Sequence, residues 1–335
     1  MTLEKTAERP ATITGLFNQA RENLKQRGVE RPLPSQSNYL ASAQENRELL
    51  DSIFIESRLL DPVTPDTSTA LFGAKLKTPA FCSAVGRPDY LTDEDMVEVV
   101  RGMGKAGSLM MLGIGGSDLL QAAIDTGTPV VKMVKPYRNT DLIYQKVRDA
   151  EERGCLAVGM DIDHFYGVYR DGKADRTEIF APKQTADIVQ AISSTRLPFI
   201  IKGVLGVQDA VKAVQIGASA IVVSNHGWGA FDFGIPSIVA LPRIAAAVGS
   251  RVTVLVDSGF RTGNDVFKAL ALGAKGVGLA TSVLAAAGAG AEGVEQLIGF
   301  ITDELKRTMA IAGCPSLAAI GQPLLVTSPR VAPWW

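Results

Sequence analysis

The chain of 335 residues has only three cysteines, Cys82, Cys155 and Cys314, with no Cys-x-x-Cys spacing. Scattered thiols in an odd number predict neither a disulfide framework nor a zinc site, and they are typical of a reducing compartment. We therefore expect a cytoplasmic protein without a metal site. Histidine is scarcer still, so any imidazole chemistry must use either His164 or His226.

Neither charge is in excess, because 34 Lys and Arg residues face 35 Asp and Glu residues. There is no cluster of basic residues, no run of 18 apolar residues, and no apolar signal-peptide core in the first residues, MTLEKTAERP. These absences argue against nucleic-acid binding, membrane association and secretion. A small-molecule substrate is the remaining expectation.

From about residue 78 onward, one pattern recurs: a short apolar run, a Gly-rich or polar turn, then an amphipathic stretch. Eight apolar runs begin at Ala80, Ser108, Val130, Leu156, Phe199, Ala220, Val252 and Gly276. Helical patterns lie at about 93–106, 117–126, 139–152, 183–194, 207–216, 237–248, 264–272 and 291–312. Continuous hydrophobicity suits strands that are covered by helices on one side and by a packed interior on the other. Eight such units predict a (β/α)₈ TIM barrel in preference to an open doubly wound sheet.

Residues 1–78 lie outside this repeat and are expected to form an N-terminal helical extension packed on a barrel of residues 79–327. An apolar helical face runs from Ile13 to Leu24, and a second helix is expected around Asn46 to Phe54. Their apolar residues are too few for a separate core. The tail at 328–335 is expected to be a strap on the barrel surface.

Polar residues and glycines gather where the apolar runs end. In TIM barrels the active site lies at the C-terminal ends of the strands, so these residues should converge on one rim. With their direct neighbours, the residues at these ends are Ser83, Ala84, Val85, Gly113, Lys132, Lys135, Asp161, Asp163, Lys202, Ser224, His226, Gly227, Asp257, Ser258, Gly259, Arg261, Ala280 and Thr281.

The loops after strands seven and eight carry the features of a phosphate site. The string from Asp257 to Gly263 combines glycines, which allow close backbone approach, with Arg261 as a charged clamp. A helix N-terminus follows, and barrels often bind phosphate at this place. No Gly-x-Gly-x-x-Gly string follows the first strand, so a dinucleotide such as FAD or NAD is not expected.

Lys202 lies inside the apolar run FIIKGV, where a charged amine must find an anionic or electron-rich partner. Three roles remain open for it from the residues alone. It is a Schiff-base nucleophile, a cation beside a reduced cofactor, or the structural partner of a barrel carboxylate such as Asp161.

The segment from Phe199 to Val283 resembles the FMN-dependent 2-hydroxy acid oxidases and dehydrogenases. The matching strings are IIKGV, AVQIGA, IVVSNHG and, above all, VDSGFRTGNDVFKALALGAKGVGLA. Weaker similarity covers nearly the whole chain, including ENRELLDSIFIESRLL near the N-terminus and ELKRTMAIAGCPSLAAI near the C-terminus. The resemblance implies a TIM barrel that binds FMN and oxidises a hydroxy acid.

The resemblance also implies roles for individual residues. His226 would take the proton of the substrate hydroxyl as the α-hydrogen leaves as hydride to the flavin, and Asp163 would orient His226. Lys202 would stabilise negative charge on the reduced ring. The remaining cofactor-binding set is Ser83, Ala84, Val85, Gly113, Lys132, Asp161, Ser224, Gly227, Asp257, Ser258, Gly259, Arg261, Ala280 and Thr281.

Several family residues are replaced in this chain. Gly229 stands where the family has the arginine that clamps the substrate carboxylate, and Val134 stands for a tyrosine that binds the same group. Further replacements are Lys132 for glutamine, Gly113 for serine, Asp161 for threonine and Thr281 for arginine, and the segment 165–183 is shorter than the family's lid. We therefore expect a bulkier or less acidic substrate than glycolate or lactate, with Lys132 or Arg87 as the first candidates for a substitute cation.

The sequence thus predicts a homo-oligomeric FMN-dependent oxidoreductase that passes electrons to oxygen or another acceptor. Two alternatives stay open: an FMN-dependent isomerase or reductase, similar to the type 2 isopentenyl-diphosphate isomerases, and a degenerate flavin-binding homologue that serves as a partner protein. His164 is either a substrate contact or a surface residue, and Trp228 either stacks on a ring or packs within its loop.

Overall fold

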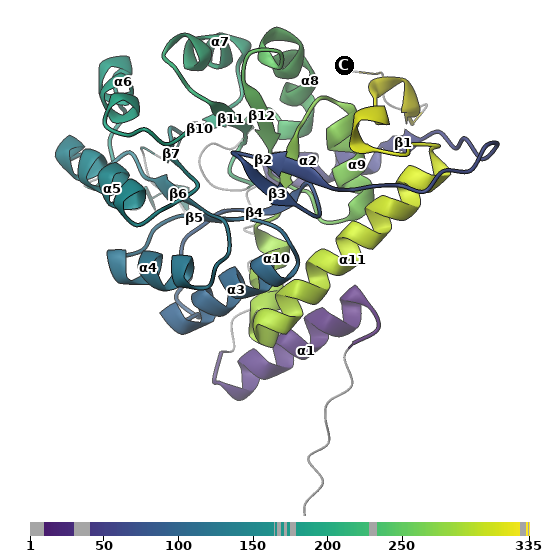
Figure 1. Cartoon of the computed structure of the whole chain (residues 1–335), viewed down its shortest axis with the longest axis horizontal. Coiled ribbons are helices and arrows are strands. Elements are labelled where there is room, and N and C mark those ends of the chain that lie inside the picture. Colours follow the sequence, from purple (N-terminus) through teal and green to yellow (C-terminus); the bar gives the residue numbers. More distant parts are fainter. Residues whose placement is uncertain are drawn as a thin grey trace, which may run out of the picture.

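The computed structural model describes residues 10–29, 41–163, 165, 179–227, 233–328, 333 and 335, and the backbone of 169–170 and 173–174. At its centre is the predicted closed barrel of parallel strands (Figure 1). The strands follow one another around the barrel in chain order, and the last pairs with the first. They are β4 (Ala80–Val85), β5 (Met110–Leu112), β6 (Val130–Val134), β7 (Ala157–Asp161), β10 (Phe199–Val204), β11 (Ala220–Val223), β12 (Thr253–Val256) and β13 (Gly276–Gly278).

A layer of helices surrounds the barrel, and their ends agree with the predicted ranges to within two residues. They are α3 (Asp93–Lys105), α4 (Ser117–Asp125), α5 (Thr140–Glu152), α6 (Thr185–Ser193), α7 (Val207–Gln215), α8 (Ser237–Val248), α9 (Gly263–Ala271) and α11 (Gly290–Ile311). Local chemistry sets several ends: Thr92 and Asp95 form a capping box at the start of α3. Gly217 and Gly273, with φ of +96° and +104°, follow the ends of α7 and α9.

Alternation along each strand divides the core into two parts. Inward residues fill the barrel, among them Phe81, Met111, Met133, Ile200 and Leu255. Outward residues of the same strands pack against the helices in a second, larger cluster. Both faces of each strand are therefore buried, which explains the continuous apolar runs in the sequence.

A hairpin of β2 (Thr69–Leu71) and β3 (Ala74–Leu76) closes the N-terminal end of the barrel. Leu71 and Leu76 belong to the interior cluster, and Leu71 packs against Gly276 at the start of β13. The opposite end, where the strands finish, is therefore the one at which polar groups can reach a ligand.

The N-terminal extension departs from its prediction at one place. Helix α1 (Ile13–Gln26) packs on α11, beside which it lies in Figure 1, and α2 spans Ala41–Asp51. The predicted helix at 46–54 is wrong at its end, because Ile53–Ile55 form β1, which pairs antiparallel with β14 (Leu325–Thr327). The pairing partner lies about 270 residues away, so no local pattern indicates it.

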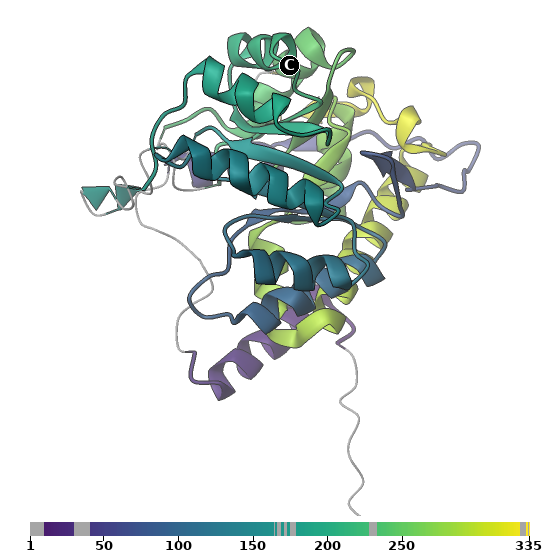
Figure 2. The same cartoon turned by 60° about the vertical axis from the view of Figure 1, so that its left-hand side comes forward.

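A short helix that the sequence pattern missed, α10 (Thr281–Ala286), follows β13 directly. The remaining elements are 3₁₀ turns at Ala287–Ala289, Leu317–Ala319 and Gln322–Leu324, and a hairpin of β8 (Tyr169–Arg170) and β9 (Lys173–Ala174). This hairpin extends away from the barrel body (Figure 2). His164, Trp228, Gly229 and most of the tail at 328–335 lie outside the described residues.

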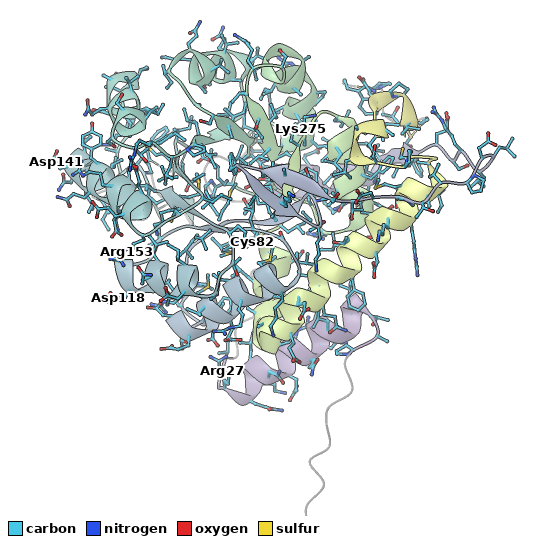
Figure 3. The ribbon with its side chains drawn as sticks, viewed as in Figure 1. Arg27, Cys82, Asp118, Asp141, Arg153 and Lys275 are labelled. Atoms are coloured by element: carbon cyan, nitrogen blue, oxygen red, sulfur yellow. The ribbon has the colours of Figure 1, made fainter. Side chains whose placement is uncertain are left out.

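Cys82 lies in the barrel wall, whereas charged residues such as Asp118 and Arg153 lie on the surrounding layer (Figure 3). Burial raises the pKa of the Cys82 thiol, so it behaves as a small apolar side chain and not as a nucleophile. Among the described helices, none is both long and apolar enough to cross a membrane.

Candidate active site

The top layer of the barrel interior differs from the layers beneath it. The last inward position of every strand, or the one directly after it, is polar or glycine, although the inward positions below are apolar. We call these residues the rim layer: Ser83, Gly113, Lys135, Asp161, Lys202, Ser224, Asp257 and Gly278. Six of the eight can donate or accept hydrogen bonds through their side chains, so this is where a polar ligand fits.

Lys202 is the central cation of the rim layer and is 2% exposed. Its Nζ lies 2.7 Å from Ser224 Oγ, 3.0 Å from Asp257 Oδ2 and 3.9 Å from Asp161 Oδ1. Burial alone would lower the pKa of Lys202, but the two carboxylates outweigh burial and raise it. The amine is therefore protonated, which argues against the Schiff-base role and leaves the two cationic roles.

Asp257 ties Lys202 to the neighbouring strands. It accepts hydrogen bonds from the hydroxyl groups of Ser83 and Ser258 as well as pairing with Lys202. Burial would raise the pKa of Asp257, yet Lys202 and the hydroxyl groups of Ser224 and Ser83 hold it below its usual range. Five of the predicted site residues, Ser83, Lys202, Ser224, Asp257 and Ser258, are thus joined in one network.

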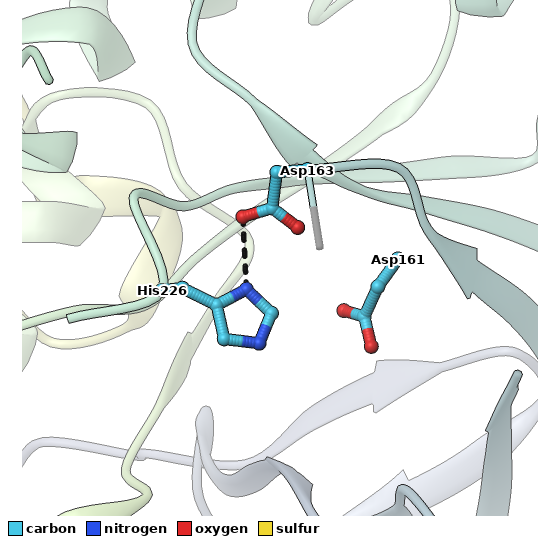
Figure 4. Close-up of side chains that lie close together, drawn as sticks. All are labelled: Asp161, Asp163 and His226. Carbon is cyan, nitrogen blue, oxygen red and sulfur yellow. Dashed lines mark hydrogen bonds and ion pairs between the residues drawn. The ribbon is translucent and has the colours of Figure 1, made fainter. Parts of the chain in front are cut away.

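His226 and Asp163 form the second feature of the rim. His226 Nδ1 lies 2.8 Å from Asp163 Oδ2 (Figure 4). When Nδ1 carries the proton and donates it to Asp163, Nε2 is left as the acceptor that a general base needs. Burial would raise the pKa of Asp163, but His226 and Lys202 lower it, so the carboxylate is charged.

The backbone at His226 is held in an uncommon conformation. Its φ is +59°, in the left-handed region, and Gly227 follows at +75°. The His226 N–H donates to Ser224 Oγ, and the Gly227 N–H donates to Asn225 Oδ1, which fix this turn. Such strain in a non-glycine residue is typical of functional sites.

Lys135 is expected from the sequence at the end of the third strand but without a role, and the structure brings it into the site. It is the inward residue directly after β6, and it is 7% exposed. Its Nζ lies 2.7 Å from Asp161 Oδ2 and 3.5 Å from His226 Nε2. Asp161 is fully buried, and although burial would raise its pKa, Lys135, His226 and Lys202 lower it.

Lys132 does not join this group, which corrects the prediction that it lines the cofactor. Val131 and Met133 face the barrel interior, so Lys132 and Val134 face the helices. The Lys132 ammonium donates to the Gly113 carbonyl. Burial lowers the pKa of Lys132 to about 8. Lys146 and Asp149, both in α5, have smaller effects on this pKa, and the rim carboxylates have none.

Arg87, the other suggested substitute cation, is also engaged elsewhere. Its guanidinium pairs with Asp93 at 2.9 Å and donates to the Leu91 carbonyl, and its side chain is 45% exposed. Neither candidate named from the sequence therefore lies beside His226.

Two residues of α2 brace the rim, and both were absent from the predicted site. Asn46 and Asn225 exchange side-chain hydrogen bonds at 3.0 and 3.1 Å, which ties α2 to the turn that carries His226. Arg47 binds Asp265 at 2.8 Å and donates to the Gly259 carbonyl, which ties α2 to the loop after β12. Both belong to the string ENRELL, whose family resemblance was the available signal.

The expected phosphate site is altered by the structure. Ser258 and Gly259 adopt φ of +83° and +88°, so the loop after β12 makes the predicted tight turn. However, the first N–H groups of α9 are already capped: Arg261 and Thr262 donate to Asp265, and Gly263 donates to Glu304. The N-terminus of α9 is therefore not open to a phosphate, which corrects that prediction.

A phosphate could still bind between the loops that follow β12 and β13, next to Arg261 and Thr281. The Arg261 and Thr281 side chains are exposed, and α10 begins at Thr281 next to half-buried Ala280. The first N–H groups of a helix have no acceptor within it. Barrels that bind phosphate after strands seven and eight commonly use such a short extra helix.

Asp161, Asp163 and His226 place possible ligand atoms within 4.8 Å of one another, a spacing that would also suit a metal ion. The Lys135 ammonium already lies against Asp161 on this side of the rim. A lysine cation therefore neutralises the carboxylates that a metal would otherwise have to share.

Comparison with known proteins gives consistent results. A family model described as FMN-dependent dehydrogenase matches residues 20–192 and 174–327. Glycolate oxidase 3 of Arabidopsis thaliana is 30% identical over 318 residues, which cover 83% of this chain and 86% of that protein. The 4-hydroxymandelate oxidase of Amycolatopsis orientalis is 32% identical over 318 residues, covering 83% and 88%. A crystal structure of mandelate oxidase matches with a TM-score of 0.84 and 30% identity, over 95% of this chain and 98% of that one.

Proposed function

The chain belongs to the FMN-dependent dehydrogenase family, and from this premise we propose that it oxidises a hydroxy acid at the rim layer with His226 as the base. The protein is an FMN-dependent oxidoreductase, as the resemblance in its sequence implied. The observation that carries the proposed mechanism is the 2.8 Å pair between His226 Nδ1 and Asp163, which turns Nε2 towards the rim.

The residues at the rim suit FMN. Oδ1 of buried Asp161 accepts no hydrogen bond from the described residues, because Lys135 lies at Oδ2 and Lys202 Nζ is 3.9 Å from Oδ1, and a ring N–H or a hydroxyl of FMN would supply the missing donor. Lys202 offers a buried, protonated amine to an electron-rich ring edge. The residues that would hold FMN are Ser83, Ala84, Val85, Gly113, Asp161, Lys202, Ser224, Gly227, Asp257, Ser258, Gly259, Arg261, Ala280 and Thr281.

Proton transfer is assigned to His226. As the hydroxyl carbon of the substrate is oxidised, Nε2 takes the hydroxyl proton, and Asp163 compensates for the charge of the resulting imidazolium. FMN, when bound, supplies the acceptor for the hydride that leaves the same carbon. Lys202 lies ready to balance the negative charge that arises when the ring is reduced.

The charges of the described rim residues support this assignment. Two ammonium groups, Lys135 and Lys202, face three carboxylates, Asp161, Asp163 and Asp257. One carboxylate is thus left for His226 to balance, and it is the one that contacts the ring. The site is closer to electroneutrality after His226 has accepted a proton than before.

We propose a substrate larger than glycolate. The named relatives act on glycolate and on 4-hydroxymandelate, both of which are hydroxy acids. The sequence has Gly229 in place of a bulky cation, which favours the larger acid. A cytoplasmic location, a homo-oligomeric state and oxygen or another small molecule as the electron acceptor complete the proposal.

Steady-state kinetics with glycolate, lactate and mandelate would test it, using FMN-loaded protein. We expect turnover to be highest with mandelate and to produce the matching keto acid. Tight FMN binding without turnover of any hydroxy acid would instead support an isomerase, a reductase or a degenerate partner protein.

A further inference from the structure

We propose that Lys135, held by Asp161, is the cation that receives the carboxylate of the substrate beside His226. The inference rests on the proposed oxidation of a hydroxy acid and adds a residue to it. Lys135, which follows a different strand of the barrel, would bind the carboxylate in place of the arginine that is absent at position 229.

The position of Lys135 suits an anion attached to a reacting carbon. In a 2-hydroxy acid the carboxylate is bonded directly to the carbon that bears the hydroxyl. An anchor for it must therefore lie next to the base that takes the hydroxyl proton. Lys135 Nζ is 3.5 Å from His226 Nε2, and both groups are at the open end of the barrel.

The other cations near the rim are already committed. Lys202 contacts Ser224 and Asp257 at hydrogen-bond distance, and its remaining N–H is the one that the proposed function assigns to the flavin ring. Arg87 pairs with Asp93, and Lys132 faces the helices. Among the described residues, Lys135 is thus the cation that is both beside His226 and able to offer a donor to a substrate.

Asp161 explains how Lys135 is held in place. A lysine side chain is long and flexible, and fixing its amine costs side-chain entropy. The ion pair at 2.7 Å with a fully buried carboxylate fixes the amine at the rim. Asp161 and Lys135 both lie on the inner face of adjacent strands, because β6 and β7 are paired in parallel register.

Substrate binding would also free the base. Before the substrate arrives, Lys135 Nζ lies 3.5 Å from His226 Nε2, at the limit of hydrogen-bond distance. A carboxylate is a stronger partner for an ammonium than a neutral ring nitrogen. When the substrate carboxylate takes over this donor, Nε2 becomes available to the substrate hydroxyl, so anion recognition and base activation are coupled through one amine.

The test uses binding of unreactive ligands to the FMN-loaded protein. Phenylacetate has the carboxylate but no hydroxyl, and phenylacetamide is its neutral counterpart. Dissociation constants are measured from the change in flavin absorbance on titration. We expect Lys135→Met to weaken phenylacetate binding about tenfold or more and to change phenylacetamide binding less than about twofold.

Lys132→Met is the matched control, because it makes the same change on the same strand but on the other face. It should leave both dissociation constants unchanged. Lys135→Arg, which keeps the charge, should retain part of the preference for phenylacetate and guards against a folding defect in the methionine variant. An unchanged ratio of the two constants in Lys135→Met would overturn the inference.

The two proposals can fail separately. The titration needs no turnover, so charge-dependent binding through Lys135 in a protein that oxidises no hydroxy acid would refute only the proposed function. Efficient oxidation together with an unchanged ratio would refute only the role of Lys135.

Discussion

The lower and upper parts of the barrel interior are formed by the same strands but differ in polarity and in role. Below, Phe81, Met111, Met133 and Leu255 fill the space with apolar side chains. One inward step higher on each strand, the side chains are charged, hydroxylated or absent. The lower part stabilises the barrel by burial, whereas the upper part keeps charges that are costly to bury unless they are paired.

Three buried lysines show what decides whether a buried charge is costly or useful. Lys132 faces the helices without a carboxylate partner, and burial lowers its pKa to about 8. Lys202, equally buried, has carboxylate partners that raise its pKa. Lys135, three residues after Lys132, reaches such a partner in Asp161. The side of the strand therefore determines whether a buried lysine is a structural burden or a functional cation.

The largest effect is expected at the base. His226→Asn should lower the rate of substrate oxidation by a factor of about 10²–10⁴, because the variant lacks the ring nitrogen that takes the hydroxyl proton. Asp163→Asn, which keeps the base but removes its charged partner, should cost less. Single-turnover measurements of flavin reduction would check both, and equal losses in the two variants would contradict the division of roles.

Lys202→Met should affect both chemistry and stability. Losing the charge opposite the reduced ring should slow flavin reduction roughly 100-fold, or about 3 kcal/mol. The same change leaves Asp257 buried without its cation, which should lower the free energy of unfolding by about 3–5 kcal/mol. Stopped-flow reduction and urea unfolding measure the two effects. A variant with wild-type stability would show that Asp257 finds another partner.

Lys132→Met should have the opposite effect on the free energy of unfolding. Removing a buried amine that has no carboxylate partner should raise the free energy of unfolding by about 1–2 kcal/mol at pH 7 without altering flavin reduction. Because the pKa of Lys132 is lower in the folded protein than in the unfolded chain, the unfolded state binds more protons between about pH 8 and 10.5. The wild type should therefore gain stability over that range relative to the variant. Parallel unfolding curves at pH 7 and pH 9.5 measure the difference, and a constant gap would refute this explanation.

The smallest effect is expected at the pair of Asn46 and Asn225, which links α2 to the turn that carries His226. Asn46→Ala breaks the paired amides with Asn225, each worth about 1 kcal/mol. Catalysis should fall several-fold while FMN affinity changes little, since the pair supports the turn of His226. The control is Gln44→Ala on the exposed face of the same helix, which should change neither. A loss of FMN without a loss in rate would assign Asn46 to cofactor binding instead.

Much of the fold could be predicted because it depends on short, local sequence patterns. Each strand and each outer helix is a short run with its own pattern and end signals, such as Thr92 and Gly273. The pairing of β1 with β14 was missed because its partners are far apart in the chain. Helix α10 was missed because its six residues, TSVLAA, are mostly small and too few to show a clear amphipathic period.

The site was less predictable at β6, and the reason is physical. A strand buried on both faces has no alternation between polar and apolar residues, so the sequence VVKMVK does not show which lysine faces inward. His226, Asp163 and Lys202 were found because they lie at the ends of predicted barrel strands, and the family resemblance then implied their roles. Asn46 and Arg47 act on loops 179 and 212 residues away, which only the fold brings to them.

The central claim is that the rim layer oxidises a hydroxy acid with His226 as the base. Anaerobic addition of mandelate to the FMN-loaded protein tests it most directly, because bleaching of the flavin absorbance reports the oxidation itself. We predict full bleaching in the wild type and almost none in His226→Asn that retains its FMN. Bleaching at the wild-type rate in that variant, or none in either protein, would contradict the account.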